Sequence, residues 1–263
     1  MSGGSAQTSR RPWYDVAFQA DYLARYARHS DAVATADAPF LARMLALPRG
    51  ARVLDLCCGA GRHARALSRL GLWVVGVDRS APLLQAGLTH AKSRRRAQYV
   101  RGDMRRLPLR TESLDGAINL FTSFGYFPRG AEDLRVLREV RRVLKPGARL
   151  VFDFFNFTHT LRNLVAQSER RLAGHKLTEQ RHYDRRRRRL VKVVSFDGGA
   201  GTPRKESVRA YTPAELARLF RRAGLKLIAR LGDLRGAPFS SANSPRCVLV
   251  ACKPARSRRR AAG

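Results

Sequence analysis

The sequence predicts an α/β protein built on an open, mostly parallel β-sheet. Short apolar segments that suit strands alternate with segments that suit helices over residues 51–155, and the pattern resumes over 211–253. This alternation is typical of βαβ units, whose right-handed crossovers bring the carboxyl ends of the strands to one edge of the sheet. Ligands of open α/β sheets bind at that edge.

Seven strands are expected in this sheet, each a short apolar run bounded by turn residues. They lie at residues 52–57, 73–77, 98–101, 114–121, 149–155, 226–231 and 247–252. Helices fit between them, with clear helical periodicity over residues 132–144 until Lys145-Pro146-Gly147 ends the segment. The sequence from Thr212 to Glu215 resembles a capping box and begins the last helix.

The N-terminal segment is expected to be helical. Residues 12–29 predict one helix, on which four aromatic residues recur every fourth position along one face: Tyr14, Phe18, Tyr22 and Tyr26. A second, short helix is expected at 39–47. The aromatic stripe has two open interpretations, core packing or contact with a ligand.

Residues 156–210 break the alternation of strands and helices. They contain three strand-like runs, at 176–183, 190–196 and 205–211, joined by turn sequences such as Asp197-Gly198-Gly199. This segment is interpreted as an antiparallel β cap inserted into the main fold.

Basic side chains dominate the composition. The chain has 263 residues, with 52 Lys and Arg against 20 Asp and Glu, a net charge of +32, and 44% hydrophobic residues. That hydrophobic fraction excludes a disordered chain, and four cysteines are too few for a disulfide scaffold. No apolar run is long enough to span a membrane, so we expect a cytoplasmic protein without membrane association.

The excess of arginine has two interpretations. It fits a polyanionic partner such as RNA, with the dense run Arg185–Arg189 as a phosphate contact. It equally fits a compositional bias, because single arginines are scattered along the whole chain. Arginines gathered around a binding pocket would favour RNA, and an even spread would favour a small-molecule ligand.

Three carboxylates stand at equivalent places in the predicted sheet. Asp55 lies near the end of the first strand, Asp78 ends the second and Asp103 follows the third. The turn from Gly59 to Gly61 presents backbone N–H groups at a helix N-terminus, and Asp78 is placed to accept ribose hydroxyls. A dinucleotide cofactor is disfavoured, since the third glycine of its motif is missing and Asp55 would repel a pyrophosphate. A ligand with an amino group and a sulfonium, and without a phosphate, suits this acidic edge better.

These segments resemble the motifs of class I S-adenosylmethionine-dependent methyltransferases. The resemblance rests on five segments, in the order and spacing of that family: residues 53–62, 74–80, 102–109, 114–121 and 144–147. Trp13-Tyr14-Asp15 and Pro238-Phe239 are similar to a generic bacterial subgroup without an assigned substrate. The resemblance implies a Rossmann-like, seven-stranded methyltransferase sheet whose last strand is antiparallel.

The resemblance also implies S-adenosylmethionine as cofactor and a set of residues around it. Asp55 and the glycine turn would hold the methionine end, Asp78 the ribose, and Asp103 with Met104 the adenine. The full implied set is Asp55, Cys57, Gly59, Gly61, Asp78, Arg79, Asp103, Met104 and Leu120, with Tyr14 and Tyr22 from the N-terminal helix acting as a lid. Cys57 departs from the family, which usually has glycine there. Either its backbone is ordinary or the cofactor lies slightly differently.

The methyl acceptor is expected beyond the fourth strand, at the aromatic run 121–127. Phe124 and Tyr126 are predicted to contact it, and Tyr126, Asn156 and His159 to orient or deprotonate it. No histidine or cysteine spacing suggests a metal site.

Two functions follow. The first is a methyltransferase acting on nitrogen or oxygen of a small molecule; the alternative is an RNA-directed methyltransferase or RNA-binding protein. The expected organisation is a helical lid at 1–50, the cofactor-binding core at 51–155 and 211–253, the β cap at 156–210 and a basic, disordered tail at 254–263.

Overall fold

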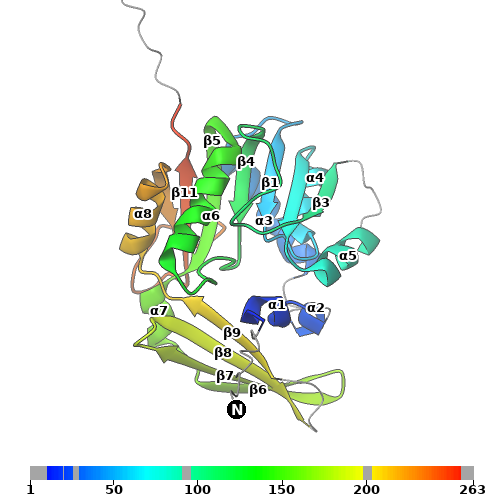
Figure 1. Cartoon of the computed structure of the whole chain (residues 1–263), viewed down its shortest axis with the longest axis vertical. Coiled ribbons are helices and arrows are strands. Elements are labelled where there is room, and N and C mark those ends of the chain that lie inside the picture. The colour runs from blue at the N-terminus through cyan, green and yellow to red at the C-terminus, as the bar shows by residue number, and fades with distance from the viewer. Residues whose placement is uncertain (1–10, 20, 26–29, 91–95, 198–202, 256–263) are drawn as a thin grey trace, which may run out of the picture.

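The computed structural model describes residues 11–19, 21–25, 30–90, 96–197 and 203–255 (Figure 1). Its main sheet has seven strands in the order β10-β11-β5-β4-β1-β2-β3. The strands are β1 (Arg52–Leu56), β2 (Trp73–Asp78), β3 (Ala97–Arg101), β4 (Leu114–Asn119), β5 (Leu144–Phe155), β10 (Lys226–Leu231) and β11 (Arg246–Cys252). The pairs among β1 to β5 are parallel, and β11 is antiparallel to both of its neighbours. The predicted fold class is confirmed.

Helices cover both faces of this sheet. Helices α3 (Asp31–Leu45) and α4 (Arg62–Arg69) pack on one face against Val53, Val74 and Ile118. Helices α6 (Gly130–Val143) and α8 (Pro213–Arg222) pack on the other, where Leu54 and Phe152 point. Helix α5 (Ala81–His90) lies beside β2 and β3. Neighbouring strand residues alternate between the two faces, so the strands are apolar throughout.

The inserted cap is a second, antiparallel sheet. After α7 (Phe157–Arg162) it runs through β6 (Gln167–Leu172), β7 (His175–Asp184), β8 (Arg189–Phe196) and β9 (Arg204–Arg209), paired in that order. The sequence predicted β7, β8 and β9 but missed β6. This edge strand buries none of its residues, so it lacks the apolar alternation by which strands are detected.

The N-terminal helices lie between the main sheet and the cap (Figure 1). The single helix predicted over 12–29 is wrong: α1 (Trp13–Ala17) and α2 (Asp21–Arg25) are separate. The carbonyl of Ala17 accepts from the Arg25 guanidinium at 2.6 Å, and that of Phe18 accepts from the Ser80 hydroxyl at 2.6 Å. These carbonyls are bound by side chains instead of by a continuing helix.

The next helix also differs from its prediction. Helix α3 begins at Asp31, and Pro39 lies inside it instead of in its first turn. Tyr26 and most of the predicted basic tail, from residue 256, lie outside the described residues.

Candidate functional site

A cavity of about 440 Å³ opens at the carboxyl ends of β1, β2 and β4 and beside the segment after β3. Asp55, Asp78 and Asp103 all line it. Tyr14 and Phe18 of the α1 segment and Tyr22 of α2 line the opposite wall. Its volume lies within the usual range for small-molecule sites, roughly 300–1,000 Å³. The three carboxylates therefore line one cavity, as the sequence predicted.

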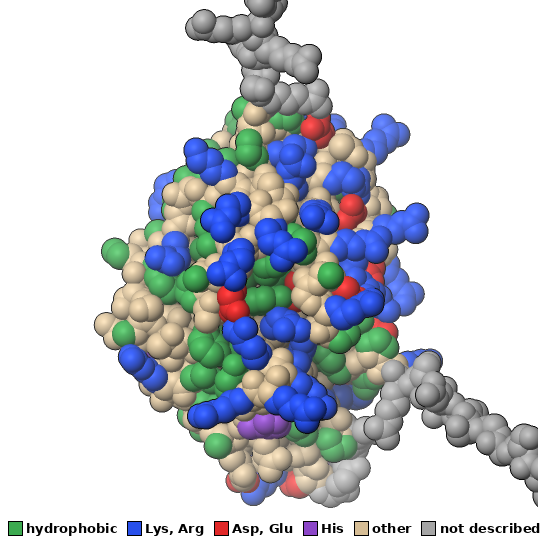
Figure 2. All heavy atoms as spheres, turned by 60° about the vertical axis from the view of Figure 1, so that its left-hand side comes forward, with side chains coloured by type: hydrophobic (Ala, Val, Ile, Leu, Met, Phe, Trp, Pro, Cys, Tyr) green, Lys and Arg blue, Asp and Glu red, His purple; other side chains and the backbone are tan. Residues whose placement is uncertain are grey.

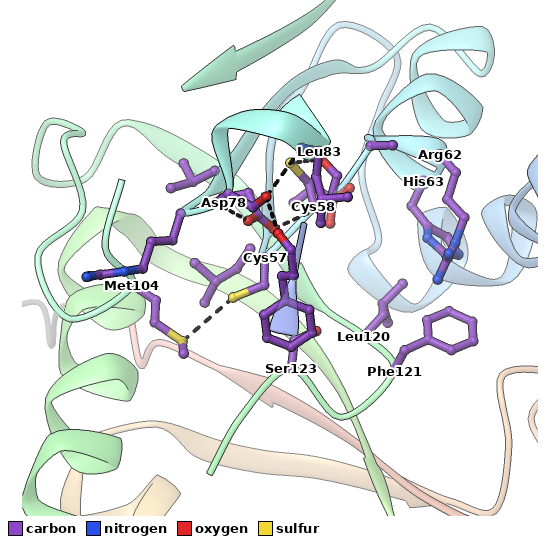
Figure 3. A pocket seen from close by; sticks show the side chains of 18 of the residues that line it. Cys57, Cys58, Arg62, His63, Asp78, Leu83, Met104, Leu120, Phe121 and Ser123 are labelled. Atoms are coloured by element: carbon purple, nitrogen blue, oxygen red, sulfur yellow. Dashed lines mark hydrogen bonds between the residues drawn. The ribbon is translucent and has the colours of Figure 1, made fainter. Parts of the chain in front are cut away.

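Asp78 is fixed by the glycine turn. Its Oδ2 accepts a hydrogen bond from the Gly59 N–H at 2.8 Å, and its Oδ1 accepts one from the Ser80 N–H at 2.8 Å (Figure 3). Burial raises the pKa of the carboxyl, although these N–H groups oppose the shift. A carboxylate has about four lone-pair sites, and the backbone N–H groups of Gly59, Ser80 and Arg79 engage this one. The carboxylate therefore retains capacity for a hydrogen bond from a ligand hydroxyl.

Asp55 lies deeper in the cavity wall, with 4% of its surface exposed. Its Oδ2 accepts from the Ala64 N–H in the first turn of α4 at 3.1 Å. Burial raises the pKa of this carboxyl to about 6, against the opposing charges of His63 and Arg62. A cationic ligand group next to Asp55 would favour its charged form.

Asp103 is held by two arginines. Its Oδ2 accepts from Arg105 at 2.6 Å and from Arg79 at 2.9 Å. Burial alone would raise the pKa of Asp103, but the hydrogen bonds from Arg105 and the charge of Arg79 lower it. Arg79 also forms an ion pair with Asp15 of α1. One charge network thus joins the N-terminal helices to the segment after β3.

Cys57 adopts the left-handed backbone conformation, with φ of +59°. An ordinary backbone at this position is therefore excluded, and the Cβ costs about 1–2 kcal/mol. The Cys57 N–H donates to the Val77 carbonyl at 2.7 Å, which holds the turn against β2. Its sulfur lies 3.7 Å from that of Met104, and both residues line the cavity (Figure 3).

The two glycines of the turn have different surroundings. Gly59 lines the cavity, whereas Gly61 is the N-cap of α4 and is not among the lining residues. A Cβ on Gly61 would lie 2.2 Å from the Tyr99 ring, and φ there is +70°. Gly61 therefore serves the packing of α4 on β3.

At the far end of the cavity, Phe121 of the predicted acceptor run lies beside two residues that the sequence interpretation did not select, Arg62 and His63. Arg62, His63 and Phe121 lie there together, away from Asp78 and Met104 (Figure 3). The Arg62 guanidinium lies 4.6 Å from the centre of the Phe121 ring, and His63 Nε2 is 3.3 Å from the Asp37 carboxylate. Their place in the sequence could have identified Arg62 and His63, because the first turn of the helix after a glycine turn faces the ligand edge.

Comparison with known proteins agrees with this geometry. Residues 53–147 match the family described as "Methyltransferase domain". This match supports the resemblance to class I S-adenosylmethionine-dependent methyltransferases for the part of the chain that contains β1 to β4. It is similar to a 2-phytyl-1,4-naphtoquinone methyltransferase of Synechococcus elongatus, at 40% identity over 107 residues, 38% of this chain and 44% of the relative. A demethylmenaquinone methyltransferase of Staphylococcus aureus is 36% identical over 107 residues, 39% of this chain and 42% of that protein. The chain thus spans less than half the length of these curated relatives.

Solved structures resemble the whole fold around the methyltransferase domain. The CcbJ methyltransferase of Streptomyces caelestis has a TM-score of 0.76 at 24% identity, covering 92% of this chain and 98% of its own. CalS10, an amino pentose methyltransferase of Micromonospora echinaspora described as bound to SAM, has a TM-score of 0.66 at 21% identity, covering 90% and 97%. At such identities the likeness shows the fold.

Three predicted acceptor-site residues lie away from the cavity of the methyltransferase domain, and those predictions are corrected. Phe124 is 1% exposed and packs in the core against Phe152, with ring centres 5.1 Å apart. Asn156 is buried, and its amide donates to the carbonyls of residues 240, 241 and 244. His159 lies on α7 and does not line the cavity. Of the predicted acceptor residues, Tyr126 alone lines it.

Of the basic residues, Arg62, Arg65 and Arg79 line the cavity, and Arg65 and Arg79 form ion pairs with Asp31, Asp15 and Asp103. In the cap run, Arg187 pairs with Asp184 at 3.3 Å, Arg188 pairs with Glu215 at 2.7 Å, and Arg189 is buried. Figure 2 shows Lys and Arg side chains spread over a whole face among neutral and apolar ones. This distribution does not favour the RNA interpretation.

Neither a metal centre nor a membrane segment is found in the part of the chain that the structure describes. Within it, no three His, Cys, Asp or Glu side chains are grouped to hold a metal ion. No helix among the described residues has both the length and the apolar character needed to cross a bilayer.

Proposed function

We propose that this chain is an S-adenosylmethionine-dependent methyltransferase that methylates nitrogen or oxygen of a small molecule. The observation that carries the proposal is the single cavity that Asp55, Asp78 and Asp103 line together with the aromatic residues Tyr14, Phe18 and Tyr22. A carboxylate-lined pocket suits a cationic ligand that has hydroxyls but no phosphate.

The donor groups fit the cofactor. The remaining capacity of the Asp78 carboxylate suits a ribose hydroxyl, and buried Asp55 suits the methionine amino group. Met104 and Asp103 line the part expected to hold adenine. When bound, the cofactor supplies a methyl group already activated by its sulfonium. The protein then has to align the acceptor and exclude water.

The aromatic wall is suited to these two tasks. Tyr14, Phe18 and Tyr22 line the cavity, and the Phe18 and Tyr126 rings stack with centres 5.7 Å apart. Burial raises the pKa of the Tyr126 phenol well above its ordinary value. Tyr126 therefore stays neutral near pH 7 and can orient an acceptor through its hydroxyl, but it is a poor base.

A small acceptor is favoured over RNA because the cavity of about 440 Å³ suits a small ligand and because Arg187 and Arg188 of the cap run are paired with Asp184 and Glu215. The named relatives act on naphthoquinones, but they match this chain over 107 residues alone. We therefore propose a small acceptor without assigning it to that class. The four free cysteines fit a reducing compartment, so we propose the cytoplasm as the site of action.

The test is a transfer experiment. The protein is incubated with S-adenosylmethionine carrying a tritiated methyl group and with cell extract, which is then separated into metabolites, RNA and protein. We expect label in the metabolite fraction and none with the Asp78→Ala variant. Label in RNA would establish the alternative, and no transfer to any fraction would contradict the proposal.

A further inference from the structure

Arg189 differs from the four arginines that precede it. Arg185, Arg186, Arg187 and Arg188 are exposed, whereas Arg189, the first residue of β8, is 8% exposed. Its side chain points into the protein, at the junction between the cap and the segment that follows β4.

The buried guanidinium binds main-chain oxygens. It donates to the carbonyls of Gly125, Tyr126 and Phe127, at 3.0 Å each. On the cap side, its Nε donates to the Ser207 hydroxyl at 2.7 Å, and Nη2 donates to the Ser207 carbonyl. Arg189 thus fastens three consecutive peptide groups of one segment to β9.

The segment that it fastens forms a wall of the cavity. Ser123, Tyr126 and Phe127 line the cavity on the side where the acceptor is expected. This segment follows β4 and is not paired in the sheet, and its backbone turns sharply, with positive φ at Phe121 and Gly125. Its buried carbonyls therefore need donors from elsewhere. Arg189 supplies most of them, together with the Arg209 N–H, which donates to Gly125 at 2.8 Å.

Only an arginine can make this set of contacts. The planar guanidinium presents five N–H donors in a fixed fork, whereas a lysine ammonium has three donors on a flexible stem. Its burial is costly, and it lowers the pKa of Arg189. The nearby buried carboxylate of Asp133 offsets part of that cost.

We propose that Arg189 is a positioning residue through which the cap sheet sets the shape of the acceptor side of the cavity. This inference rests on the proposed function. It assigns to the cap a direct part in acceptor selection, since the Tyr126 ring is placed by a side chain of β8.

Trp13 provides a direct readout of the wall. Its indole Nε1 donates to the Tyr126 carbonyl at 3.3 Å, and its ring lies 5.0 Å from the Tyr126 ring. The chain has two tryptophans, so a Trp73→Phe background leaves Trp13 as the single indole fluorophore. Arg189→Ala and Arg189→Lys are compared in that background with Arg187→Ala, which removes an exposed arginine of the same run.

We expect a red shift of Trp13 emission in both Arg189 variants. Affinity for S-adenosylhomocysteine should fall about fivefold, the equivalent of one lost aromatic contact. Millimolar guanidinium ion should restore both readouts in Arg189→Ala, which a general loss of packing would not allow. Arg187→Ala should match the parent protein.

If Arg189→Ala does not fold, the emission and affinity of Arg189→Lys test the inference. Parental emission and affinity in a folded Arg189→Lys variant would overturn the inference. Failure of the parent protein to bind S-adenosylhomocysteine would contradict the proposed function instead, so the two failures are distinguishable.

Discussion

Asp55→Asn should make the protein more stable at neutral pH while weakening cofactor binding. The side chain is 4% exposed, and burial raises the pKa of its carboxyl to about 6. In the unfolded chain the same group loses its proton near pH 3.8. Between these two pKa values the folded state binds more protons than the unfolded chain does. The free energy of unfolding therefore falls as pH rises. Above pH 6 the full cost of the buried charge persists.

The magnitude follows from the two pKa values. A shift from 3.8 to about 6 corresponds to about 3 kcal/mol. Asparagine removes this cost, because it is neutral and can still accept from the Ala64 N–H. The unfolding temperature should rise by up to roughly 6–12 °C at pH 7.5 and should not change at pH 4. Affinity for S-adenosylhomocysteine should fall about tenfold, as a charged hydrogen bond becomes a neutral one.

Thermal unfolding from pH 4 to pH 8, with calorimetry of S-adenosylhomocysteine binding, measures both effects. Asp133→Asn is the matched control: burial raises the pKa of Asp133 to about 6 as well, but it contacts Tyr211 away from the cavity. Asp133→Asn should remove the fall in stability over the same pH range. Because Asp133 also offsets the buried charge of Arg189, any loss of affinity should be smaller than that of Asp55→Asn. An Asp55→Asn protein that is less stable than the parent at pH 7.5 would refute this reasoning.

Three further predictions concern packing and the N-terminal helices. Gly61→Ala should destabilise the protein far more than Gly147→Ala, since both have positive φ but Gly61 alone faces the Tyr99 ring; equal losses in urea unfolding would contradict this. Phe124→Ala should cost about 3–5 kcal/mol of unfolding free energy and leave S-adenosylhomocysteine affinity unchanged. A loss of affinity without a loss of stability would show that Phe124 belongs to the binding site. Arg79→Gln removes the ion pair to α1 and should speed S-adenosylhomocysteine dissociation in stopped-flow measurements; an unchanged rate would show that this pair does not hold the helices closed.

The cofactor side of the site could be predicted because it depends on local sequence. Asp55, Asp78 and Asp103 each stand at the end of a strand or just beyond it, so strand recognition alone places them at one edge. Cys57 shows the limit of this approach. Its sequence could not tell which backbone conformation it adopts, and the turn holds it at positive φ.

The acceptor side depends on contacts between distant parts of the chain. Two consecutive left-handed residues, Phe121 and Thr122, change which side chains of the segment face the cavity. The Phe121 N–H donates to the Asp153 carboxylate at 2.8 Å, a partner in β5 that no local pattern reveals. This turn directs Phe124 into the core and leaves Tyr126 at the cavity.

Contacts between distant parts of the chain also explain why the roles of Asn156 and Arg189 were not predicted. Asn156 was selected because it follows a strand, but its partners are carbonyls more than eighty residues later in the chain. Arg189 was grouped with Arg185–Arg188 as a phosphate contact, because sequence cannot distinguish the one buried member of that run. Both roles follow from how the cap and the segment before β11 pack on the core.

Calorimetric titration of the protein with S-adenosylmethionine tests the central claim most directly. The account predicts binding by the parent protein and a loss of about 1.5–3 kcal/mol, roughly 10- to 150-fold, in Asp78→Ala. Asp115→Ala, at the opposite edge of the same sheet, should bind as the parent does. If the alanine variant does not fold, Asp78→Asn replaces it in the titration. Undiminished affinity in a folded Asp78 variant, or no binding by the parent protein, would contradict the account.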